Sequence, residues 1–293
     1  MSFGGQIAEP ALPGWMRKRK LRLGDLHEIK HTVRGGGLHT VCEEARCPNR
    51  SECFGRGTAT FLINGRVCTR NCSYCSIAHG RPSPVDEDEP NQLVTAARAM
   101  RLKHVVITAV DRDDLVDGGA SGFVRCIRLL AELPDPPTVE VLTPDFRGDL
   151  NQVDRIIEAG PDVYNHNVET VPRLYREVRR SGRYEWALKV LSRVTERRPG
   201  VLRKSGLMVG LGETLDEVVE VLRDLREVGC QVVTIGQYLQ PTTEQVPVAR
   251  YWRPQEFSDV ERLGGDLGME IFAGPFVRSS YRAEEAYLRV IGS

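Results

Sequence analysis

Residues 58–75 read TATFLINGRVCTRNCSYC, a short β-rich run followed by three cysteines. Thr58 to Ile63 is dominated by β-branched and apolar residues, which is typical of a buried strand. Cys68, Cys72 and Cys75 follow it with C-x3-C-x2-C spacing. The stretch therefore predicts a strand with three thiols on the loop that comes after it.

Short β-rich runs alternate with helix-like stretches through most of the remaining chain. Unbroken alternation of this kind implies a parallel sheet with right-handed crossovers. Eight units complete a TIM barrel, so six units predict an α/β fold with an open, partial barrel whose site lies on the loops after the strands. The predicted strands are Thr58 to Ile63, His104 to Val110, Thr138 to Thr143, Val163 to Glu169, Leu202 to Leu211 and Val232 to Leu239, and the predicted helices are Asn91 to Arg101, Gly122 to Leu133, Leu150 to Ala159, Arg173 to Arg198 with a break near Ser181-Gly182, Leu215 to Val228 and Pro254 to Leu267.

Both ends of the chain fall outside this repeat. We expect an N-terminal extension over residues 1–57, the partial barrel over 58–273 and a C-terminal extension over 274–293. One barrel with extensions fits the length, because α/β barrels often take roughly 200 to 250 residues as a single domain. The extensions are predicted to cap one end of the barrel.

Composition limits the partners of this chain. Its 293 residues are 41% hydrophobic and 27% charged, which indicates a globular protein with a sizeable core. Forty basic and forty acidic residues cancel, so there is no overall positive field for nonspecific nucleic-acid binding. No run of eighteen apolar residues and no secretory signal occurs. We therefore expect a cytoplasmic protein without nucleic-acid or membrane partners.

Cysteines are the most informative residues of the sequence. Six of the eight fall within 34 consecutive positions, from Cys42 to Cys75. Thiols stay reduced in the cytoplasm, so this crowding indicates metal binding rather than disulfides. Cys126 and Cys230 stand alone in apolar surroundings and are predicted to be small core residues.

Each cysteine triplet suits an iron-sulfur cube. Three thiolates from the loop of Cys68, Cys72 and Cys75 are able to hold three irons of a [4Fe-4S] cluster and leave the fourth iron open. Structural zinc is the alternative, but it needs a fourth ligand, for which His79 is a weak candidate. Upstream, a second triplet at C-x4-C-x5-C spacing again has no nearby fourth ligand, which favours a second cube. The second triplet consists of Cys42, Cys47 and Cys53.

A C-x3-C-x2-C loop after the first strand of a partial barrel resembles the radical S-adenosylmethionine (SAM) superfamily. The resemblance implies that SAM binds the open iron and is cleaved to a 5′-deoxyadenosyl radical, which removes hydrogen from unactivated carbon. The two triplets in this order resemble the lipoyl synthase family, whose auxiliary cluster is consumed as the source of two sulfur atoms. Further segments extend that resemblance over nearly the whole chain: Cys47-Pro48-Asn49, Asp111-Arg112-Asp113-Asp114, Asp117-Gly118-Gly119-Ala120, Thr143-Pro144-Asp145-Phe146, Asn165-His166-Asn167-Val168-Glu169-Thr170, Lys204-Ser205-Gly206, Gly236-Gln237-Tyr238-Leu239-Gln240-Pro241 and Arg278-Ser279-Ser280-Tyr281.

Arg278-Ser279-Ser280-Tyr281 resembles the C-terminal motif whose serine gives the auxiliary cluster an oxygen ligand. The resemblance favours Ser280, with Ser279 as the alternative. A hydroxyl is a weaker iron ligand than a thiolate, which suits a cluster that must open. The structural alternative is a turn, or an N-cap for a helix from Arg282 to Val290, since serine is common there.

Four more residues are candidates for SAM or substrate contacts. Gly118 and Gly119 follow the second strand, and the resemblance favours contact with the methionine end of SAM; a simple turn is the alternative. Asn167 and Glu169 share one face of the fourth strand, because alternate residues of a strand point the same way. They suit ribose hydroxyls or substrate, with a purely structural role as the alternative.

Three other polar residues are singled out with less specific expectations. His166 points opposite to its neighbours and is expected to be a packed, hydrogen-bonded histidine. Arg179 and Lys204 are candidates for meeting a carboxylate or the substrate, although solvated or ion-paired basic residues are more common.

The resemblance implies a sulfurtransferase that inserts sulfur at carbons six and eight of an octanoyl chain on a carrier-protein lysine, with Cys68, Cys72, Cys75 and Ser280 in catalytic roles. The implied partners are octanoylated lipoyl domains of 2-oxoacid dehydrogenase acyltransferase subunits and the glycine cleavage H protein, a ferredoxin or flavodoxin as low-potential electron donor, and iron-sulfur carrier proteins. The alternatives are another two-cluster radical SAM enzyme, such as a methylthiotransferase, and a noncatalytic iron-sulfur or zinc protein. A module that only holds metal needs no barrel, which argues against the last.

Overall fold

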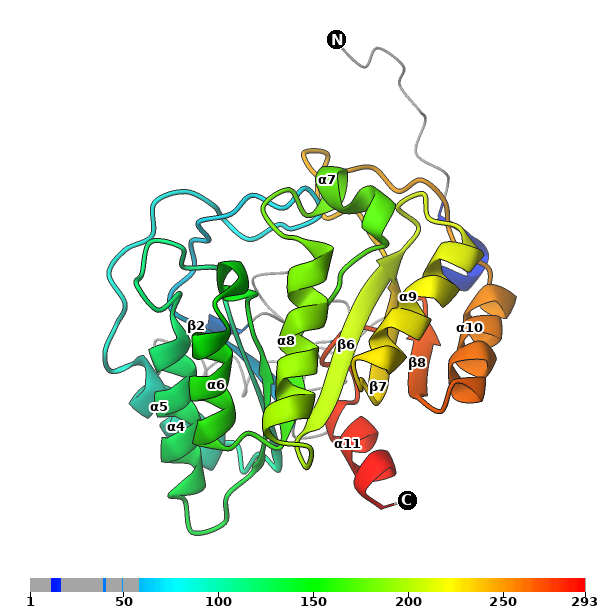
Figure 1. The fold of residues 1–293 in the computed structure, drawn as a ribbon. Coiled ribbons are helices and arrows are strands. Elements are labelled where there is room, and N and C mark those ends of the chain that lie inside the picture. The colour runs from blue at the N-terminus through cyan, green and yellow to red at the C-terminus, as the bar shows by residue number, and fades with distance from the viewer. Residues whose placement is uncertain (1–11, 17–38, 41–48, 50–57, 293) are drawn as a thin grey trace.

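The computed structural model describes residues 12–16, 39–40, 49 and 58–292, and Figure 1 shows how they are arranged. A single sheet runs through the molecule, and most helices cover one side of it. A 3-10 helix, η1 (Gly14–Met16), is the first element described.

The sheet has eight strands in the order of the chain, β1 to β8. β1 (His39–Thr40) pairs antiparallel with β2 (Thr58–Ile63), and every later pairing is parallel. The seven parallel strands, β2 to β8, do not close on themselves among the described residues, and this open sheet confirms the predicted partial barrel. The other strands are β3 (His104–Ala109), β4 (Thr138–Leu142), β5 (Val163–Asn165), β6 (Leu202–Val209), β7 (Val232–Gln237) and β8 (Glu270–Gly274).

All six predicted β-α units are present, but the sheet continues beyond them. β8 pairs in parallel with β7, and it was not predicted as a strand. Its sequence EIFAG is short, and only Ile271 and Gly274 within it are buried. A half-exposed edge strand of five residues gives little pattern to recognise.

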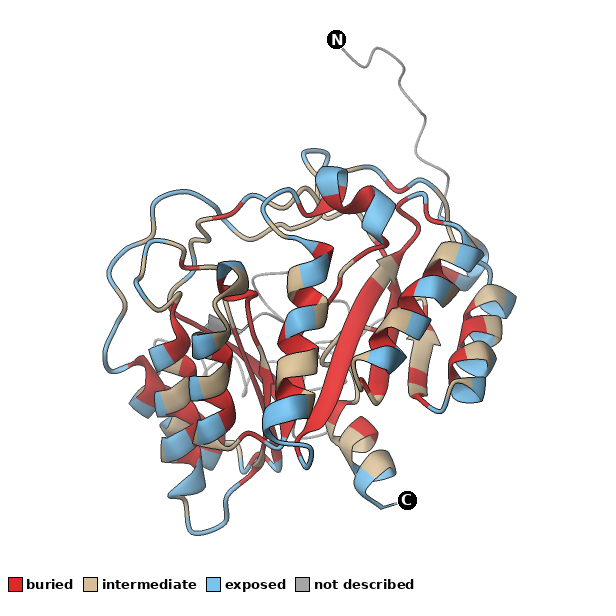
Figure 2. Ribbon diagram, viewed as in Figure 1, coloured by how far each residue is buried: buried red, intermediate tan, exposed pale blue. Residues whose placement is uncertain are grey.

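Helices form the outer layer against the convex side of the sheet. Their buried residues recur at helical spacing, so each turns an apolar stripe toward the strands (Figure 2). α9 shows a well-formed start, because Thr214 and Glu217 form a reciprocal capping box. The helices are α4 (Glu89–Ala99), α5 (Ala120–Ala131), α6 (Leu150–Ala159), α7 (Tyr175–Val178), α8 (Tyr184–Arg197), α9 (Leu215–Glu227), α10 (Pro254–Asp266) and α11 (Ala283–Ile291), with 3-10 turns η2 (Phe146–Gly148) and η3 (Pro172–Leu174).

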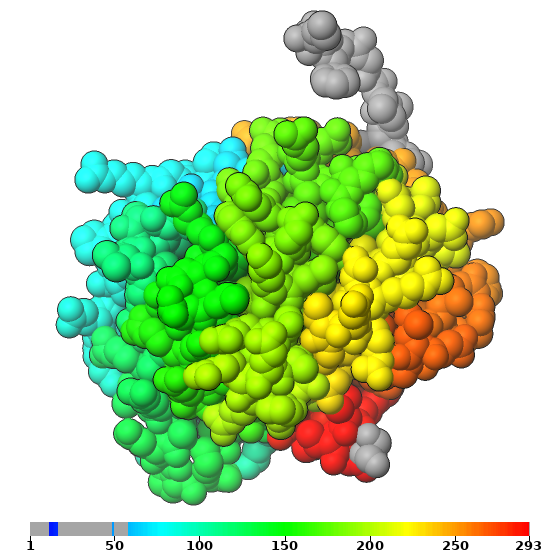
Figure 3. All heavy atoms as spheres, viewed as in Figure 1, coloured from blue at the N-terminus to red at the C-terminus, as the bar shows by residue number. Residues whose placement is uncertain are grey.

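The break predicted near Ser181-Gly182 is confirmed, since α7 ends at Val178 and α8 begins at Tyr184. Between them the chain crosses the upper end of the sheet in Figure 1. From the outside, α6, α8 and α9 close into a continuous surface over the strands (Figure 3).

Two large apolar clusters lie between the sheet and these helices. One joins β2 to β5 with α4, α5, α6 and α8, and the other joins β6 to β8 with α7 to α10. Cys126 and Cys230 are fully buried within them, which confirms their prediction as core residues. Alternate residues of a strand point to opposite faces of the sheet. The strand residues that do not join these clusters therefore point to the concave side, where we expect the site.

The amino-terminal mouth of the barrel is covered by α11. Ala286 of α11 packs against Val163, Leu202 and Val232, the first residues of β5, β6 and β7. α11 therefore lies below the strands in Figure 1, opposite the loops that follow them.

A buried ion pair lies just inside this covered end. The Lys204 ammonium donates to both carboxylate oxygens of Glu140, at 2.9 and 3.0 Å. Asn165 Nδ2 donates to the same carboxylate at 3.0 Å, and His104 Nε2 lies 3.5 Å from it. Burial alone would raise the pKa of Glu140, but the Lys204 charge and these contacts hold it at about 2. We call these four residues the floor of the barrel.

Candidate active site

The three cysteines of the C-x3-C-x2-C motif lie on the loop after β2, as predicted. Cys68 is held in place by its backbone, which bonds to Ala78 and Gly80 at 2.8 and 2.9 Å. Cys72 and Cys75 are joined by a turn, in which the Cys75 amide donates to the Cys72 carbonyl. All three are free and half-buried thiols.

This loop is tied to two distant parts of the chain. The Ser73 amide donates to the Val178 carbonyl, and the Val246 amide donates to the Ser73 carbonyl. Gln245 Nε2 donates to the Cys75 carbonyl at 3.3 Å. The thiols are thus carried on a braced segment between α7 and the loop that follows β7.

Burial raises the pKa of Cys68 to about 11 and that of Cys72 to about 12, and it also raises the pKa of Cys75. Without a bound cation the thiols therefore keep their protons at neutral pH. Iron binding replaces those protons, because thiolate is the metal-binding form. Three soft donors on one short loop fit an iron-sulfur cube that keeps one iron free.

In the described part of the chain, no three His, Cys, Asp or Glu side chains converge on a point suited to a single metal ion. A cube places each thiolate on a different iron, so its ligands need no common centre. His79, the candidate fourth zinc ligand, has its side chain in solvent and is joined to Cys68 through the backbone.

Arg70 occupies the centre of the site, between the first two cysteines. Its side chain is almost fully buried and makes ion pairs with Asp111, Asp113 and Asp145 at 3.3, 2.8 and 2.8 Å. Asp111 and Asp113 follow β3 and Asp145 follows β4, so one guanidinium joins the cysteine loop to two strand ends. The Asp111 carboxylate also lies 3.7 Å from Cys68 Sγ.

We did not single out Arg70 from the sequence. An arginine inside a cysteine loop resembles any solvated basic residue, and only the fold brings the three carboxylates to it. The segments that contain those aspartates were noted for their resemblance to a family, without a role for the carboxylates.

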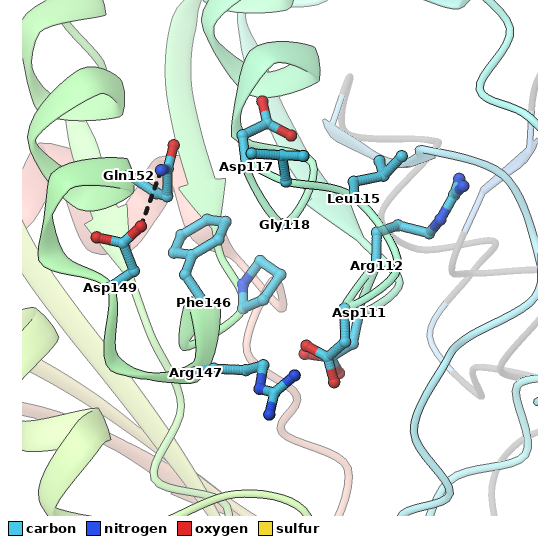
Figure 4. Close-up of a pocket in the computed structure, with 12 residues that line it drawn as sticks. Asp111, Arg112, Leu115, Asp117, Gly118, Phe146, Arg147, Asp149 and Gln152 are labelled. Atoms are coloured by element: carbon cyan, nitrogen blue, oxygen red, sulfur yellow. Dashed lines mark hydrogen bonds between the residues drawn. The ribbon is translucent and has the colours of Figure 1, made fainter.

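A pocket of about 260 Å³ lies between the loop after β3 and the connection after β4 (Figure 4), and one of its lining residues, Asp111, also contacts Cys68. Asp111 and Gly118 line it from the loop after β3, and Phe146 and Arg147 line it from the connection after β4. Gly118 has a φ of 59°, and a Cβ there would reach the Phe146 ring at 3.0 Å. A side chain at this position would therefore intrude on the pocket wall.

Gly119 lies against the scaffold. Its φ is 87°, and a Cβ there would come within 2.4 Å of Asn64 Nδ2, which donates to the Gly119 carbonyl. Close packing with Asn64 is thus one reason for glycine at this position. SAM contact by Gly118 and Gly119 stays a prediction.

Asn167 and Glu169 follow β5 and lie side by side, since Asn167 Nδ2 donates to Glu169 Oε1 at 3.2 Å. The strand was predicted to reach Glu169 but ends at Asn165, and Glu169 has a φ of 66°. Burial raises the pKa of Glu169 above its ordinary value, even though the Arg179 charge lowers it. A carboxyl group and an amide at a strand end suit hydroxyl groups of a ligand.

The other three polar residues singled out from the sequence, His166, Arg179 and Lys204, each contact other groups of the protein. His166 is buried with Nδ1 2.8 Å from the Thr143 carbonyl oxygen, which confirms a packed histidine. Arg179 is buried, donates to the Asn167 carbonyl at 2.8 Å and lies 3.6 Å from Asp145. Lys204 belongs to the floor, so the ion-paired alternative is confirmed for both basic residues.

Ser279 and Ser280 lie in the turn that follows β8. Ser279 Oγ accepts a hydrogen bond from Asn167 Nδ2 at 2.7 Å. Neither serine caps α11, because its N-cap residue is Arg282. The N-cap alternative is therefore wrong, whereas the alternative of a turn is confirmed. Asn49, next to the second triplet in sequence, donates to the Phe276 carbonyl just before this turn. Cys42, Cys47 and Cys53 themselves lie outside the described residues.

The motif placement and the fold agree with known proteins. The family model for the radical SAM superfamily matches residues 62–225. Methylornithine synthase has the same fold, with a TM-score of 0.55 at 14% identity over 93% of this chain and 94% of that chain. Coproporphyrinogen III oxidase from Escherichia coli also has a TM-score of 0.55, at 14% identity over 85% of this chain and 63% of that one. The fold and the cysteine loop thus define a radical SAM enzyme.

Sequence relatives narrow this class. Lipoyl synthases from Thioalkalivibrio sulfidiphilus and Rubrobacter xylanophilus are 50% and 52% identical to it, over 95% and 93% of the chain and 88% and 85% of their own lengths. The lipoyl synthase from Haemophilus influenzae is 50% identical over 93% of the chain and 86% of its own length. The chain belongs to the lipoyl synthase family. Its cofactors are accordingly [4Fe-4S] clusters and SAM.

Among the described residues, no helix combines the length and the apolar character needed to cross a membrane.

Proposed function

We propose that this chain converts a protein-bound octanoyl-lysine to the dihydrolipoyl form, and that Cys68, Cys72 and Cys75 hold the cluster that cleaves SAM. The observation that carries the proposal is one braced loop with three free thiols at the carboxyl end of β2, in a chain about half identical to lipoyl synthases. The donor set leaves one iron of a cube open for SAM.

We further propose that Cys42, Cys47, Cys53 and Ser280 hold the auxiliary cluster. One observation supports Ser280 over Ser279 as the ligand. The Ser280 hydroxyl makes no hydrogen bond to another described residue, whereas the Ser279 hydroxyl accepts one from Asn167. Asn49, which stands between Cys47 and Cys53 in sequence, also bonds to Phe276 in the segment that carries Ser280, which supports the proposal.

When bound, the clusters and SAM supply a carbon radical on the substrate and the sulfur that joins it at carbons six and eight. The contribution of the chain is to hold the reactants in place and to exclude water. Gly118 and Gly119 are proposed to meet the methionine end of SAM beside the pocket, and Asn167 and Glu169 to bind its ribose or the substrate. Arg70 keeps the cysteine loop and the ends of β3 and β4 in one geometry.

The partners follow from this reaction. The substrate is an octanoylated lipoyl carrier protein, and we propose lipoyl domains of 2-oxoacid dehydrogenases and the glycine cleavage H protein. A ferredoxin or flavodoxin would supply electrons, iron-sulfur carriers would rebuild the auxiliary cluster, and the cytoplasm is the proposed location. The proposed division into residues 1–57, 58–273 and 274–293 gives the auxiliary-cluster ligands to the two extensions.

Mass spectrometry of an octanoyl-lysyl carrier peptide tests the reaction. The peptide is incubated anaerobically with the reconstituted protein, dithionite and SAM, and we expect a gain of two sulfur atoms together with 5′-deoxyadenosine. Release of 5′-deoxyadenosine with an unchanged peptide would contradict the substrate and favour another two-cluster radical SAM enzyme. Absence of both products in a sample with verified clusters would contradict the radical chemistry.

A further inference from the structure

The two serines of the C-terminal motif are in different environments. Residues 278–281 form a tight turn, closed by a hydrogen bond from the Tyr281 amide to the Arg278 carbonyl at 2.9 Å. Ser279 and Ser280 are its two central residues. Of the two serines, Ser279 is the one whose side chain bonds to the barrel within the described part of the chain, through the 2.7 Å bond from Asn167.

Asn167 is well placed to hold this turn. It comes just after β5, and its backbone carbonyl accepts the Arg179 guanidinium at 2.8 Å. Its Nδ2 donates to both Ser279 and Glu169, while its Oδ1 is buried without a hydrogen bond. One amide thus joins the β5 end, where SAM or substrate is proposed to bind, to the turn that carries Ser280.

Two glycines on the concave face make room for this arrangement. A Cβ at Gly206 of β6 would lie 2.9 Å from Asn167 Oδ1 and 3.2 Å from Ser279 Oγ. A Cβ at Gly236 of β7 would collide with the Val277 carbonyl oxygen, just before the turn. Glycine at these two positions of neighbouring strands therefore lets residues 277–279 pack directly against the inner wall of the barrel.

We propose that Asn167 is a positioning residue for the C-terminal turn, and that it sets the place of the Ser280 hydroxyl by holding the hydroxyl of Ser279. Ser279 is then an anchor and Ser280 the free oxygen donor. The second half of this inference rests on the proposed role of Ser280 as a ligand of the auxiliary cluster. The first half concerns the protein alone and is testable without any cluster.

The first experiment measures amide hydrogen exchange in peptides that cover residues 275–282 of the full chain, purified without clusters. We expect Ser279→Ala and Asn167→Ala each to speed exchange roughly tenfold, as the loss of one buried hydrogen bond would. The double variant should exchange no faster than Asn167→Ala alone, because Ser279→Ala removes only a bond that Asn167→Ala already removes. Ser280→Ala is the matched control and should change exchange less than twofold.

Equal effects of Ser279→Ala and Ser280→Ala, additive effects in the double variant, or no effect of Ser279→Ala would overturn the anchor. Ser279→Ala removes only the hydroxyl group of a residue in a turn. It therefore tests the anchoring bond even if Asn167→Ala folds poorly.

A second experiment separates the anchor from the ligand. In a Cys68→Ala, Cys72→Ala, Cys75→Ala background only the auxiliary cluster is loaded, and its iron is titrated with a coloured chelator. We expect Ser279→Ala and Asn167→Ala to speed iron release severalfold, and Ser280→Ala to speed it more. If Ser280→Ala releases iron at the parent rate while the exchange result holds, the ligand role of Ser280 fails and the anchor stands. If Ser280→Ala alone speeds release, the anchor does not position the ligand and the inference fails.

Discussion

Buried charges are arranged differently at the two ends of the barrel interior: the floor, and the end with the cysteine loop, which we call the rim. At the floor, the Lys204 ammonium lies 2.9 Å from the Glu140 carboxylate, which also accepts a hydrogen bond from the Asn165 side-chain amide. At the rim, two guanidinium groups, Arg70 and Arg179, face the carboxylates of Asp111, Asp113 and Asp145 beside three protonated thiols.

The difference shows which end is scaffold and which is site. At the floor, the single positive charge of Lys204 is matched by the single negative charge of Glu140. The rim has three carboxylates for two guanidinium groups and carries three thiols, and burial holds the pKa of Asp111 above its ordinary value despite the Arg70 charge. Buried groups with perturbed pKa values that lie close together are typical of a functional site. Changes at the floor should therefore affect folding, and changes at the rim should affect chemistry.

Replacing a rim thiol should have the largest effect on activity. We expect Cys72→Ala to abolish SAM cleavage, because two thiolates do not hold the cube in place. The unfolding midpoint of the cluster-free protein should change little. Release of 5′-deoxyadenosine and thermal unfolding are the two measurements. Cys126→Ala, a core thiol of α5, is the control: it should lower stability and keep the cleavage. Cleavage by Cys72→Ala would mean that the rim is not the site.

Breaking the floor should have the largest effect on stability. Lys204→Met leaves the Glu140 carboxylate buried without its cation, which costs about 3–5 kcal/mol of unfolding free energy. Glu140→Leu together with Lys204→Met should recover at least half of this loss, since neither charge remains. Chemical unfolding of the three variants decides the point. If the double variant folds but no longer cleaves SAM, the floor is part of the site and the comparison fails.

Acid should weaken the floor in a defined pH window. The pKa of Glu140 is about 2 in the folded chain and 4.5 in its ordinary state, so the folded protein binds the proton less readily than the unfolded one. The stabilisation is then complete above about pH 5 and is lost as the pH falls toward 2; it is of order 3 kcal/mol. Unfolding free energies measured from pH 6 to pH 3 should fall more steeply for the parent chain than for Glu140→Gln. Parallel curves would contradict the pairing.

Gly206→Ala should have a smaller effect, confined to the upper barrel. Its Cβ would meet Thr234 Oγ1 at 2.6 Å and Asn167 Oδ1 at 2.9 Å. We expect a cost of about 1–3 kcal/mol from overpacking, together with faster hydrogen exchange in residues 275–282. Gly265→Ala in α10 is the control, because a Cβ there meets nothing within 4 Å. Equal effects of the two would contradict the close contact.

Sequence patterns predicted the scaffold and the first triplet because both are local signals. Alternating β-rich and helical runs are visible within windows of ten residues, and three cysteines on one loop need no tertiary information. The rule that motifs follow strands is confirmed for the cysteine loop, the Asp111 loop, the Asp145 loop and Asn167.

The side-chain pairings could not be predicted, because each joins segments far apart in the chain. Glu140 and Lys204 meet only when β4 and β6 lie on either side of β5. Arg70 meets Asp145 only through the same sheet order. β8 was missed because it is short and half-exposed. The C-terminal extension was predicted to cap one end of the barrel, but the sequence could not show which end, because the residues under α11 come from three different strands.

The covering of the amino-terminal mouth by α11 also bears on the order of assembly. A ribosome makes the chain from its amino end, so every strand exists before α11 does. Contacts such as Tyr287 with His104 join distant parts of the chain and form late for entropic reasons. Until α11 docks, water reaches the pair of Lys204 and Glu140 from below and weakens their attraction. α11, which is made after the eight described strands, thus completes the low-dielectric interior around this ion pair.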